Sequence, residues 1–121
     1  MAQYVKFEVS KDLEDSQLRA LERVRKGGKI KIGSNEVTKA IERGAAKLVL
    51  IAKDVSPPEI VMHLPLLCSE KNVPFSYVST KQALGKAAGI PVGTSSLVVT
   101  SEGDAKKEIE DISNKVASLK K

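Results

Sequence analysis

The chain has few of the residues from which catalytic and metal sites are usually built. It contains one cysteine, one histidine and no tryptophan in 121 residues. One cysteine with one histidine cannot complete a zinc site, and Asp54 with Glu59 lacks the repeated oxygen spacing of a calcium loop. His63 falls in a predicted helix, which favours a structural or surface role over a Ser-His-Asp or Cys-His arrangement. We therefore expect no metal, no cofactor and no catalytic residue.

Aromatic residues are also scarce, at 3% of the chain. They are Tyr4, Phe7, Phe75 and Tyr77, of which the last two belong to a predicted core strand. Proteins that bind single-stranded nucleic acid on an open sheet or barrel stack the bases on aromatic side chains. A basic protein without such a platform is expected to recognise a folded nucleic acid through shape, phosphates and a few hydrogen bonds.

Long hydrophobic runs are missing as well. No segment approaches the length of a membrane span, and residues 1–8 lack the apolar stretch of a signal peptide. Cys68 lies in the apolar run 64–68, where it is most simply a small buried side chain, and a lone cysteine suits a reducing compartment. We expect a single domain over residues 1–121 that is soluble, unprocessed and cytoplasmic, with no membrane partner.

Acidic residues are nearly absent from one basic segment. The chain carries 20 Lys and Arg against 15 Asp and Glu, a formal net charge of +5. Residues 23–39 hold an excess equal to that total, because only Glu36 opposes their six basic residues. These are Arg23, Arg25, Lys26, Lys29, Lys31 and Lys39. Such a concentration favours a polyanionic partner, although a solvated lysine face is the commoner meaning of a basic run.

Hydrophobic periodicity predicts helices that alternate with strands. Strands are expected over residues 29–32, 47–52, 73–78 and 97–100. Helices are expected over residues 10–26, 33–44, 56–67, 79–88 and 105–119, the third bent or interrupted at Pro65. The sequences Ser56-Pro-Pro-Glu59 and Ser79-Thr-Lys-Gln82 read as capping boxes that begin the third and fourth helices. This alternation implies an α/β fold, a three-layer α/β/α sandwich with a small central mixed sheet of about four strands.

The helix at residues 33–44 gathers an amide, a carboxylate and a basic group near its start. Asn35 and Lys39 are four residues apart and lie on one face, Glu36 flanks them, and Arg43 continues the row. Ser34 or Asn35 can cap the first amides, and the glycine after Arg43 supplies a left-handed stop. In the plainer interpretation, Glu36 only offsets the helix dipole and pairs with Lys39, for about 0.2–0.5 kcal/mol. Composition alone slightly favours that interpretation.

Residues 85–89, Gly-Lys-Ala-Ala-Gly, resemble a phosphate-binding loop only superficially. The order Gly-x-x-x-x-Gly-Lys-Ser/Thr is missing, and the segment falls within a helix rather than after a strand. We therefore predict a helix that ends at Gly89.

Several segments together resemble the kink-turn RNA-binding family named for ribosomal protein L7Ae. The resemblance begins with Gly-Ser-Asn-Glu-Val-Thr-Lys at residues 33–39 and Arg-Gly at 43–44. It continues through residues 52–60, 63–68, 81–90 and the final helix, so it covers nearly the whole chain from about Tyr4. In size, basicity and the short loop after Gly89, the chain looks most like the archaeal large-subunit ribosomal members.

The resemblance implies an α/β/α domain that binds kink-turns, RNA bends built on tandem sheared G·A pairs with one nucleotide flipped out. Asn35, Glu36 and Lys39 are implied to contact the sheared pairs. Glu36 can accept from guanine amino and imino groups, Asn35 can donate and accept, and Lys39 can donate to guanine or phosphate. The neighbouring implied contacts on this helix are Gly33, Ser34 and Arg43.

Two further segments are implied to hold the flipped-out nucleotide. The loop at residues 89–93 matches the family loop that covers the bend, with Ile90, Pro91 and Val92 as its contact residues. Ile60 and Lys81 match residues that line the nucleotide pocket. The plainer interpretation of residues 89–93 is an ordinary connection between a helix and a strand.

The implied function is that of a non-catalytic RNA-binding platform. The targets would be ribosomal RNA, box C/D and box H/ACA guide RNAs and RNase P RNA. The implied partners are a Nop-domain scaffold protein and fibrillarin in the box C/D particle, together with other ribosomal proteins. One alternative is a paralogue with a single dedicated RNA. Another is a small α/β enzyme that binds a phosphorylated ligand, which would need a glycine-rich loop after a strand or a convergent acid/base pair.

Overall fold

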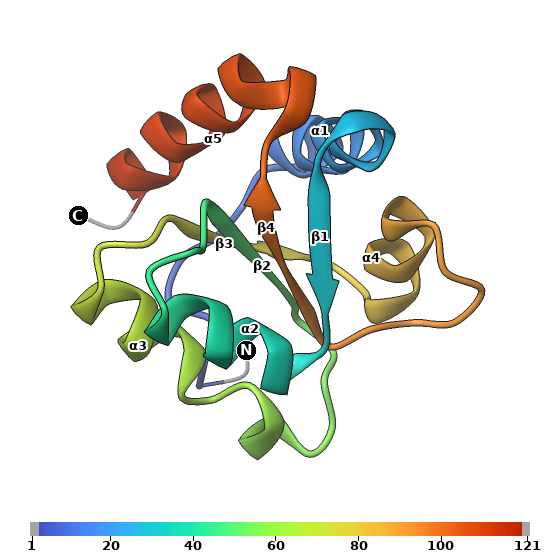
Figure 1. Cartoon of the computed structure of the whole chain (residues 1–121). Helices are drawn as coiled ribbons and strands as arrows, with labels where there is room; N and C mark the ends of the chain where they lie inside the picture. Colours follow the sequence, from blue (N-terminus) through green and yellow to red (C-terminus); the bar gives the residue numbers. More distant parts are fainter. Residues whose placement is uncertain (1–2, 120–121) are drawn as a thin grey trace.

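The computed structural model describes residues 3–119, in which helices and strands alternate from the N-terminus to the C-terminus (Figure 1). The strands are β1 (Lys29–Ile32), β2 (Leu48–Ala52), β3 (Phe75–Val78) and β4 (Ser96–Ser101). The α-helices are α1 (Lys11–Gly27), α2 (Ser34–Glu42), α3 (Leu64–Glu70), α4 (Lys81–Ala88) and α5 (Lys106–Leu119). Short 3₁₀ turns, η1 (Pro58–Ile60) and η2 (Gly103–Ala105), precede α3 and α5.

The four strands form one mixed sheet in the order β1-β4-β2-β3. β2 and β3 are parallel, whereas β4 is antiparallel to both β1 and β2. It follows that β1, β2 and β3 all run in one direction and β4 runs in the other. The segments that leave β1, β2 and β3 therefore emerge at the same edge of the sheet as the segment that enters β4. We call this the loop edge.

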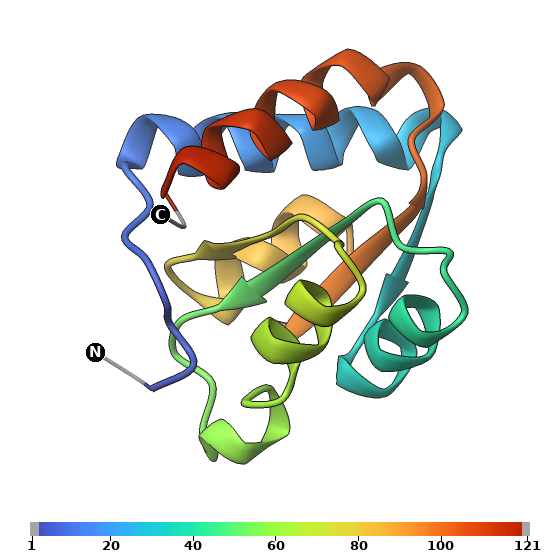
Figure 2. The same ribbon diagram turned by 90° about the vertical axis from the view of Figure 1, so that its left-hand side faces the viewer.

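Helices cover both faces of the sheet, as predicted. Helices α1, α4 and α5 pack together on one face, and α2 and α3 lie on the other (Figures 1 and 2). Every residue of β2 and β3 is buried, in agreement with the unbroken apolar run at 47–52. The α/β/α sandwich with a four-stranded mixed sheet is thus confirmed.

A buried network of tyrosines joins the N-terminal segment to the loop edge. The Tyr4 hydroxyl donates to the Ala52 carbonyl at 2.7 Å and accepts from the Val55 amide at 3.2 Å. The Tyr77 hydroxyl donates to the Tyr4 carbonyl and accepts from the Lys6 amide. Burial raises the pKa of Tyr4, and it raises the pKa of Tyr77 to about 12. The two hydrogen bonds of the Tyr4 hydroxyl, to Ala52 and Val55, hold the start of the segment that follows β2.

The prediction of a helix over residues 56–67, bent or interrupted at Pro65, is wrong for residues 56–63 and right for residues 64–67. Pro57 precedes another proline, which disfavours the helical conformation, and it is extended with φ −72° and ψ 149°, so the chain forms only the turn η1 before α3 begins at Leu64. Pro65 does not bend a longer helix but occupies the first turn of α3, where no amide donor is required. His63 consequently lies at the N-cap position of α3, on the surface, instead of inside a helix.

The cap of α4 also differs from the prediction. Thr80, rather than Ser79, accepts a hydrogen bond from the Ala83 amide. The amide and hydroxyl of Ser79 instead donate to the Glu14 carboxylate on α1. Gly89 ends α4 in the left-handed conformation, as expected from its position.

Among residues 3–119, no helix is both long and apolar enough to cross a bilayer. Cys68 is fully buried in the core, as predicted.

Candidate nucleic-acid interface

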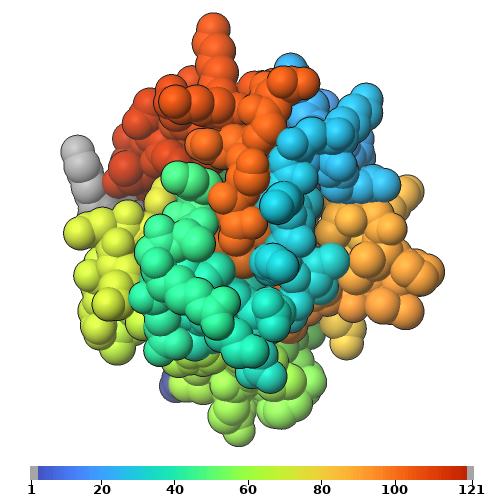
Figure 3. Space-filling model, in the orientation of Figure 1, coloured from blue at the N-terminus to red at the C-terminus, as the bar shows by residue number. Residues whose placement is uncertain are grey.

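The loop edge brings together predicted site residues that are far apart in the sequence. The start of α2 follows β1, Ile60 follows β2, Lys81 follows β3, and residues 90–92 precede β4. Figure 3 shows α2 and β1 on one exposed face, with residues 53–63 beside α2 and residues 81–93 beside β1. Topology alone therefore gathers four separate segments on one side of the protein.

The N-terminus of α2 is open. Gly33 is its N-cap residue and makes no side-chain cap, so the prediction that Ser34 or Asn35 caps the helix is wrong. Gly33 has a φ of +96°, which favours glycine, and its amide donates to the Ser96 carbonyl at 3.0 Å. This bond ties the helix start to β4. The amides of the first turn have no intrahelical partner and a positive dipole end, so they can bind an anion or a base acceptor.

The outward face of α2 carries the predicted polar groups. Asn35, Glu36 and Lys39 are exposed, whereas Val37 and Ile41 are buried beneath them. The Lys39 ammonium lies 3.6 Å from the Glu36 carboxylate, so the predicted i,i+3 pair is present. An exposed pair of this kind contributes little to stability. Neither side chain is held by burial, and both remain available to a ligand.

Two hydrogen bonds link the first turn of α2 to His63. The sequence did not predict them. The Thr38 hydroxyl donates to the Ser34 carbonyl at 2.7 Å, and its oxygen lies 2.8 Å from Nε2 of His63. Because threonine has one hydroxyl proton, His63 is the donor to Thr38. The i,i+4 spacing of Ser34 and Thr38 permits the first bond, but nothing in the sequence pairs either residue with His63.

Lys81 joins two segments of the loop edge through its backbone. Its amide donates to the Asp54 carboxylate at 2.8 Å, and its carbonyl accepts from the Thr94 amide at 3.1 Å. The segment after β2 and the segment before β4 are therefore held to the same residue. The sequence does not indicate this role for Asp54, because the amide that it binds lies 27 residues away along the chain.

The loop at residues 90–93 folds back over α4. The Ile90 amide donates to the Gly85 carbonyl at 3.1 Å. A methyl group built on Gly85 would lie 2.1 Å from the Val92 carbonyl oxygen, so only glycine permits this approach. The result is a supported loop that presents Val92, 64% exposed, with Ile60 39% exposed in the segment after β2. These are apolar side chains on an otherwise polar edge.

Arg43 does not join this group. It is the C-cap residue of α2, about 13 Å along the axis from the start of a nine-residue helix. It lies instead beside Lys71 and Asn72, which follow α3.

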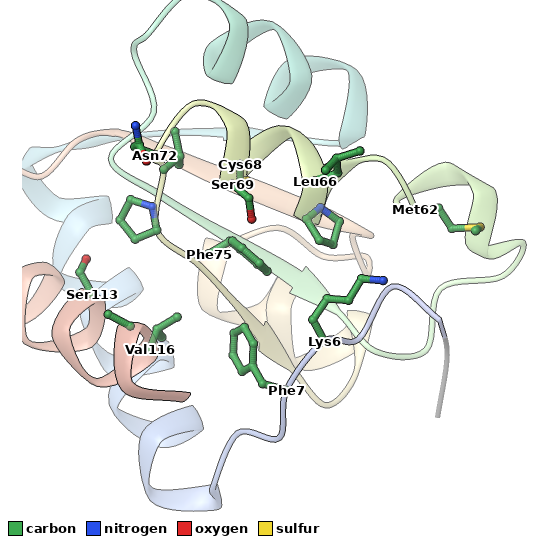
Figure 4. Close-up of a pocket in the computed structure, with 14 residues that line it drawn as sticks. Lys6, Phe7, Met62, Leu66, Cys68, Ser69, Asn72, Phe75, Ser113 and Val116 are labelled. Atoms are coloured by element: carbon green, nitrogen blue, oxygen red, sulfur yellow. The ribbon is translucent and has the colours of Figure 1, made fainter. Parts of the chain in front are cut away.

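A groove of about 890 Å³ lies away from the loop edge and was not predicted. It runs between the N-terminal segment, α3 and α5, with Phe7 and Phe75 on its floor and Leu66 at its rim (Figure 4). None of the predicted RNA-contacting residues lines it. Within residues 3–119, no group of three or more His, Cys, Asp or Glu side chains is placed to hold a metal ion.

The molecule is thus an α/β/α sandwich with polar side chains at the start of one helix and an apolar loop at the same edge of the sheet. Residues 15–109 match the family model described as the ribosomal protein L7Ae/L30e/S12e/Gadd45 family, and the chain belongs to this family. Among solved structures, it is similar to the Giardia lamblia 15.5kD RNA binding protein. The two are 32% identical, with a TM-score of 0.91 over 98% of this chain and 99% of the other. As a member of this family, the chain is not an enzyme.

Proposed function

We propose that this chain is an RNA-binding protein that recognises kink-turns. The RNA-binding activity of its structural relative and its membership of a ribosomal protein family support the general function. The arrangement of residues at the loop edge supports the more specific function, the recognition of kink-turns. The observation that carries the proposal is the open α2 N-terminus, with Asn35, Glu36 and Lys39 exposed beside it.

A carboxylate at this position is the most informative group. A site that only binds phosphate has no use for Glu36, because the carboxylate repels phosphate oxygens. Guanine presents an imino and an amino donor when its Watson–Crick edge is not paired to cytosine, as in a sheared G·A pair, and Glu36 can accept from both. Asn35 can donate and accept beside it, and Lys39 can donate to a guanine acceptor or a phosphate.

The loop at residues 90–92 forms the opposite side of the proposed site. Ile90 and Val92 supply apolar contact, Pro91 stiffens the loop, and Lys81 and Ile60 lie on the neighbouring segments of the loop edge. An unstacked nucleotide needs apolar surface for its base and a cation for its phosphate. Gly33, Ser34 and, farther along α2, Arg43 complete the proposed contacts.

In this proposal, the chain is one kink-turn RNA-binding domain that acts in the cytoplasm as a structural component of ribonucleoproteins. Its RNAs are ribosomal RNA, box C/D and box H/ACA guide RNAs and RNase P RNA. Its protein partners are other ribosomal proteins and, in the box C/D particle, a Nop-domain scaffold protein and fibrillarin. Binding free energy offsets the cost of bending the RNA, and the bound complex presents a composite surface to these partners.

The test compares two synthetic RNAs that differ only at the bend. One contains tandem G·A pairs, and in the other G·C pairs replace them so that the RNA is a regular helix. We expect the wild-type chain to bind the first at least about 100-fold more tightly, or about 2.7 kcal/mol. Equal affinities in a gel-shift titration would refute the proposal.

A substitution of Glu36 then tests the site itself. Glu36→Gln should reduce the preference for the G·A RNA more than it alters the salt dependence of binding, because the carboxylate reads bases and does not neutralise phosphates. A matched control is Glu42→Gln, on the same helix but at its C-terminal end. If both variants lose the same affinity for both RNAs, Glu36 does not read the bend.

A further inference from the structure

The basic segment that precedes α2 divides into two groups in the folded protein. Arg23 and Lys26 line a groove between α1 and α5 that also contains Glu22, Glu108 and Asp111. Arg23 forms an ion pair with Glu108 and donates to the Asp104 carbonyl at 3.2 Å. The groove also contains Arg19 and Lys115, and within residues 3–119 the ion pair of this group is the one that joins Arg23 to Glu108.

Arg25 is placed differently. Its guanidinium packs against the backbone of Gly89, since a methyl group built there would lie 2.5 Å from Cζ, Nε and Nη2 of Arg25. Gly89 is the residue before Ile90, and it also has a φ of +83°. The end of α1 thereby touches the start of the proposed RNA-contacting loop, and Figure 1 shows the end of α1 close to that of α4.

Arg25 is also an exposed cation that forms no ion pair with any other residue between 3 and 119. Within residues 3–119 it takes part in neither of the two ion pairs, those of Arg23 with Glu108 and Lys39 with Glu36. The Arg25 guanidinium packs against the Gly89 backbone, and its N–H donors face no carboxylate of residues 3–119. An exposed guanidinium in this state is suited to a phosphate, for which its donor geometry is well matched.

Two further cations connect Arg25 to the α2 site. Lys29 and Lys31 are exposed on β1 and alternate with the half-buried Ile30 and Ile32, so both project from one side of the strand. β1 runs from the end of α1 to the start of α2 (Figure 1), a distance of about 13 Å for four residues. A row of unpaired positive charge therefore leads from the open α2 N-terminus to Gly89.

From this arrangement we infer that Arg25, with Lys29 and Lys31, forms a second RNA-binding surface that binds phosphates of a stem flanking the bend. This inference rests on the proposed function, because it extends the same RNA beyond the bases read by α2. The surface contacts the backbone, because it consists of three cations spread along the end of α1 and β1, a pattern that neutralises phosphates. Arg23 and Lys26 take no part, although they belong to the same basic run.

The experiment measures binding of the G·A RNA by the full chain as a function of salt concentration. Arg25→Gln is compared with Arg23→Gln, a matched loss of one charge on the same helix. We expect Arg25→Gln to weaken binding about fivefold and to lower the slope of log K against log salt by about 0.7–0.9, the value for one phosphate contact. Arg23→Gln should leave the slope unchanged. Arg25→Lys should retain the slope, which guards against an effect of folding.

Replacement of single stem phosphates by neutral methylphosphonates then locates the contact. At the phosphate that Arg25 binds, the replacement should weaken wild-type binding and leave Arg25→Gln unaffected. The inference is overturned if the wild-type chain binds the G·A RNA but the Arg23 and Arg25 variants have equal slopes, or if no methylphosphonate removes the difference between wild type and Arg25→Gln. A wild-type chain that does not distinguish the G·A RNA from its regular-helix control refutes the proposed function itself.

Discussion

Replacement of Gly85 by alanine tests whether the loop at residues 90–93 must lie close against α4. The added methyl carbon would be 2.1 Å from the Val92 carbonyl oxygen and 3.0 Å from the Gly93 Cα. Ordinary carbon–oxygen contacts are about 3.3–3.6 Å, so the loop must move by at least about 1 Å. Because the obstructing atoms belong to the backbone, no rotation of a side chain can relieve the overlap.

The size of the effect follows from two opposing contributions. Alanine in a helix interior is favoured over glycine by about 0.8–1 kcal/mol, whereas overpacking costs about 1–3 kcal/mol. We therefore expect the free energy of unfolding to fall by up to about 2 kcal/mol. Displacement of Ile90 and Val92 should weaken binding of the G·A RNA by about tenfold, or 1.4 kcal/mol. Chemical denaturation and gel-shift titration measure the two quantities.

Gly27→Ala provides the matched control. Gly27 is the last residue of α1, and a methyl group built on it meets nothing within 4 Å. This variant should gain the helix preference without the steric cost and should bind RNA as the wild type does. If Gly85→Ala is as stable as Gly27→Ala and binds RNA with wild-type affinity, the loop does not depend on its close contact with α4.

Three other perturbations test separate parts of the protein. Lys39→Ala should weaken kink-turn binding by about 1.5–3 kcal/mol. It should change the free energy of unfolding by less than about 0.5 kcal/mol, because the ion pair of Lys39 with Glu36 is exposed. Unchanged affinity for the RNA would show that Lys39 is not part of the site. Replacement of Ile90 and Val92 by serine should hasten RNA dissociation with little effect on the melting temperature, and a large fall in that temperature would make the loop a structural element. For Tyr77, the folded protein retains the proton up to a pKa of about 12, whereas the unfolded chain loses it near 10. The free energy of unfolding should therefore fall as the pH rises from 10 to 12. The variant Tyr77→Phe should be less stable at neutral pH and should show a smaller fall over this range. An identical fall in both proteins would exclude Tyr77 as its source.

Local sequence patterns predicted helices and strands well where the hydrophobic periodicity of neighbouring side chains specifies the element. The 3.6-residue period placed Val37 and Ile41 inside and Lys39 outside, and the unbroken apolar run predicted β2. Glycines at the ends of α2 and α4 were correctly interpreted because a left-handed residue is a local requirement.

The errors arose where a distant residue competes for a local group. Ser79 resembles a cap in the sequence, but Glu14 on α1 takes both its amide and its hydroxyl, and Thr80 caps α4 instead. The start of α2 likewise differs from the local prediction, because Gly33 is the N-cap residue and its amide donates to the distant Ser96 carbonyl. No short window of sequence contains both Ser79 and Glu14, or both Gly33 and Ser96.

The class of fold and the set of chemical groups on α2 can be predicted from the sequence, because periodicity and residue type are properties of neighbouring residues. Which of these groups lie together depends on the tertiary structure. Parallel and antiparallel pairing in the sheet brings Ile60, Lys81 and Val92 to the edge where α2 begins and leaves Arg43 a helix length away. The fold also separates Arg25 from Arg23, since residues two apart in a helix are rotated by about 200° and meet different neighbours: the Gly89 backbone for Arg25 and the Glu108 carboxylate for Arg23.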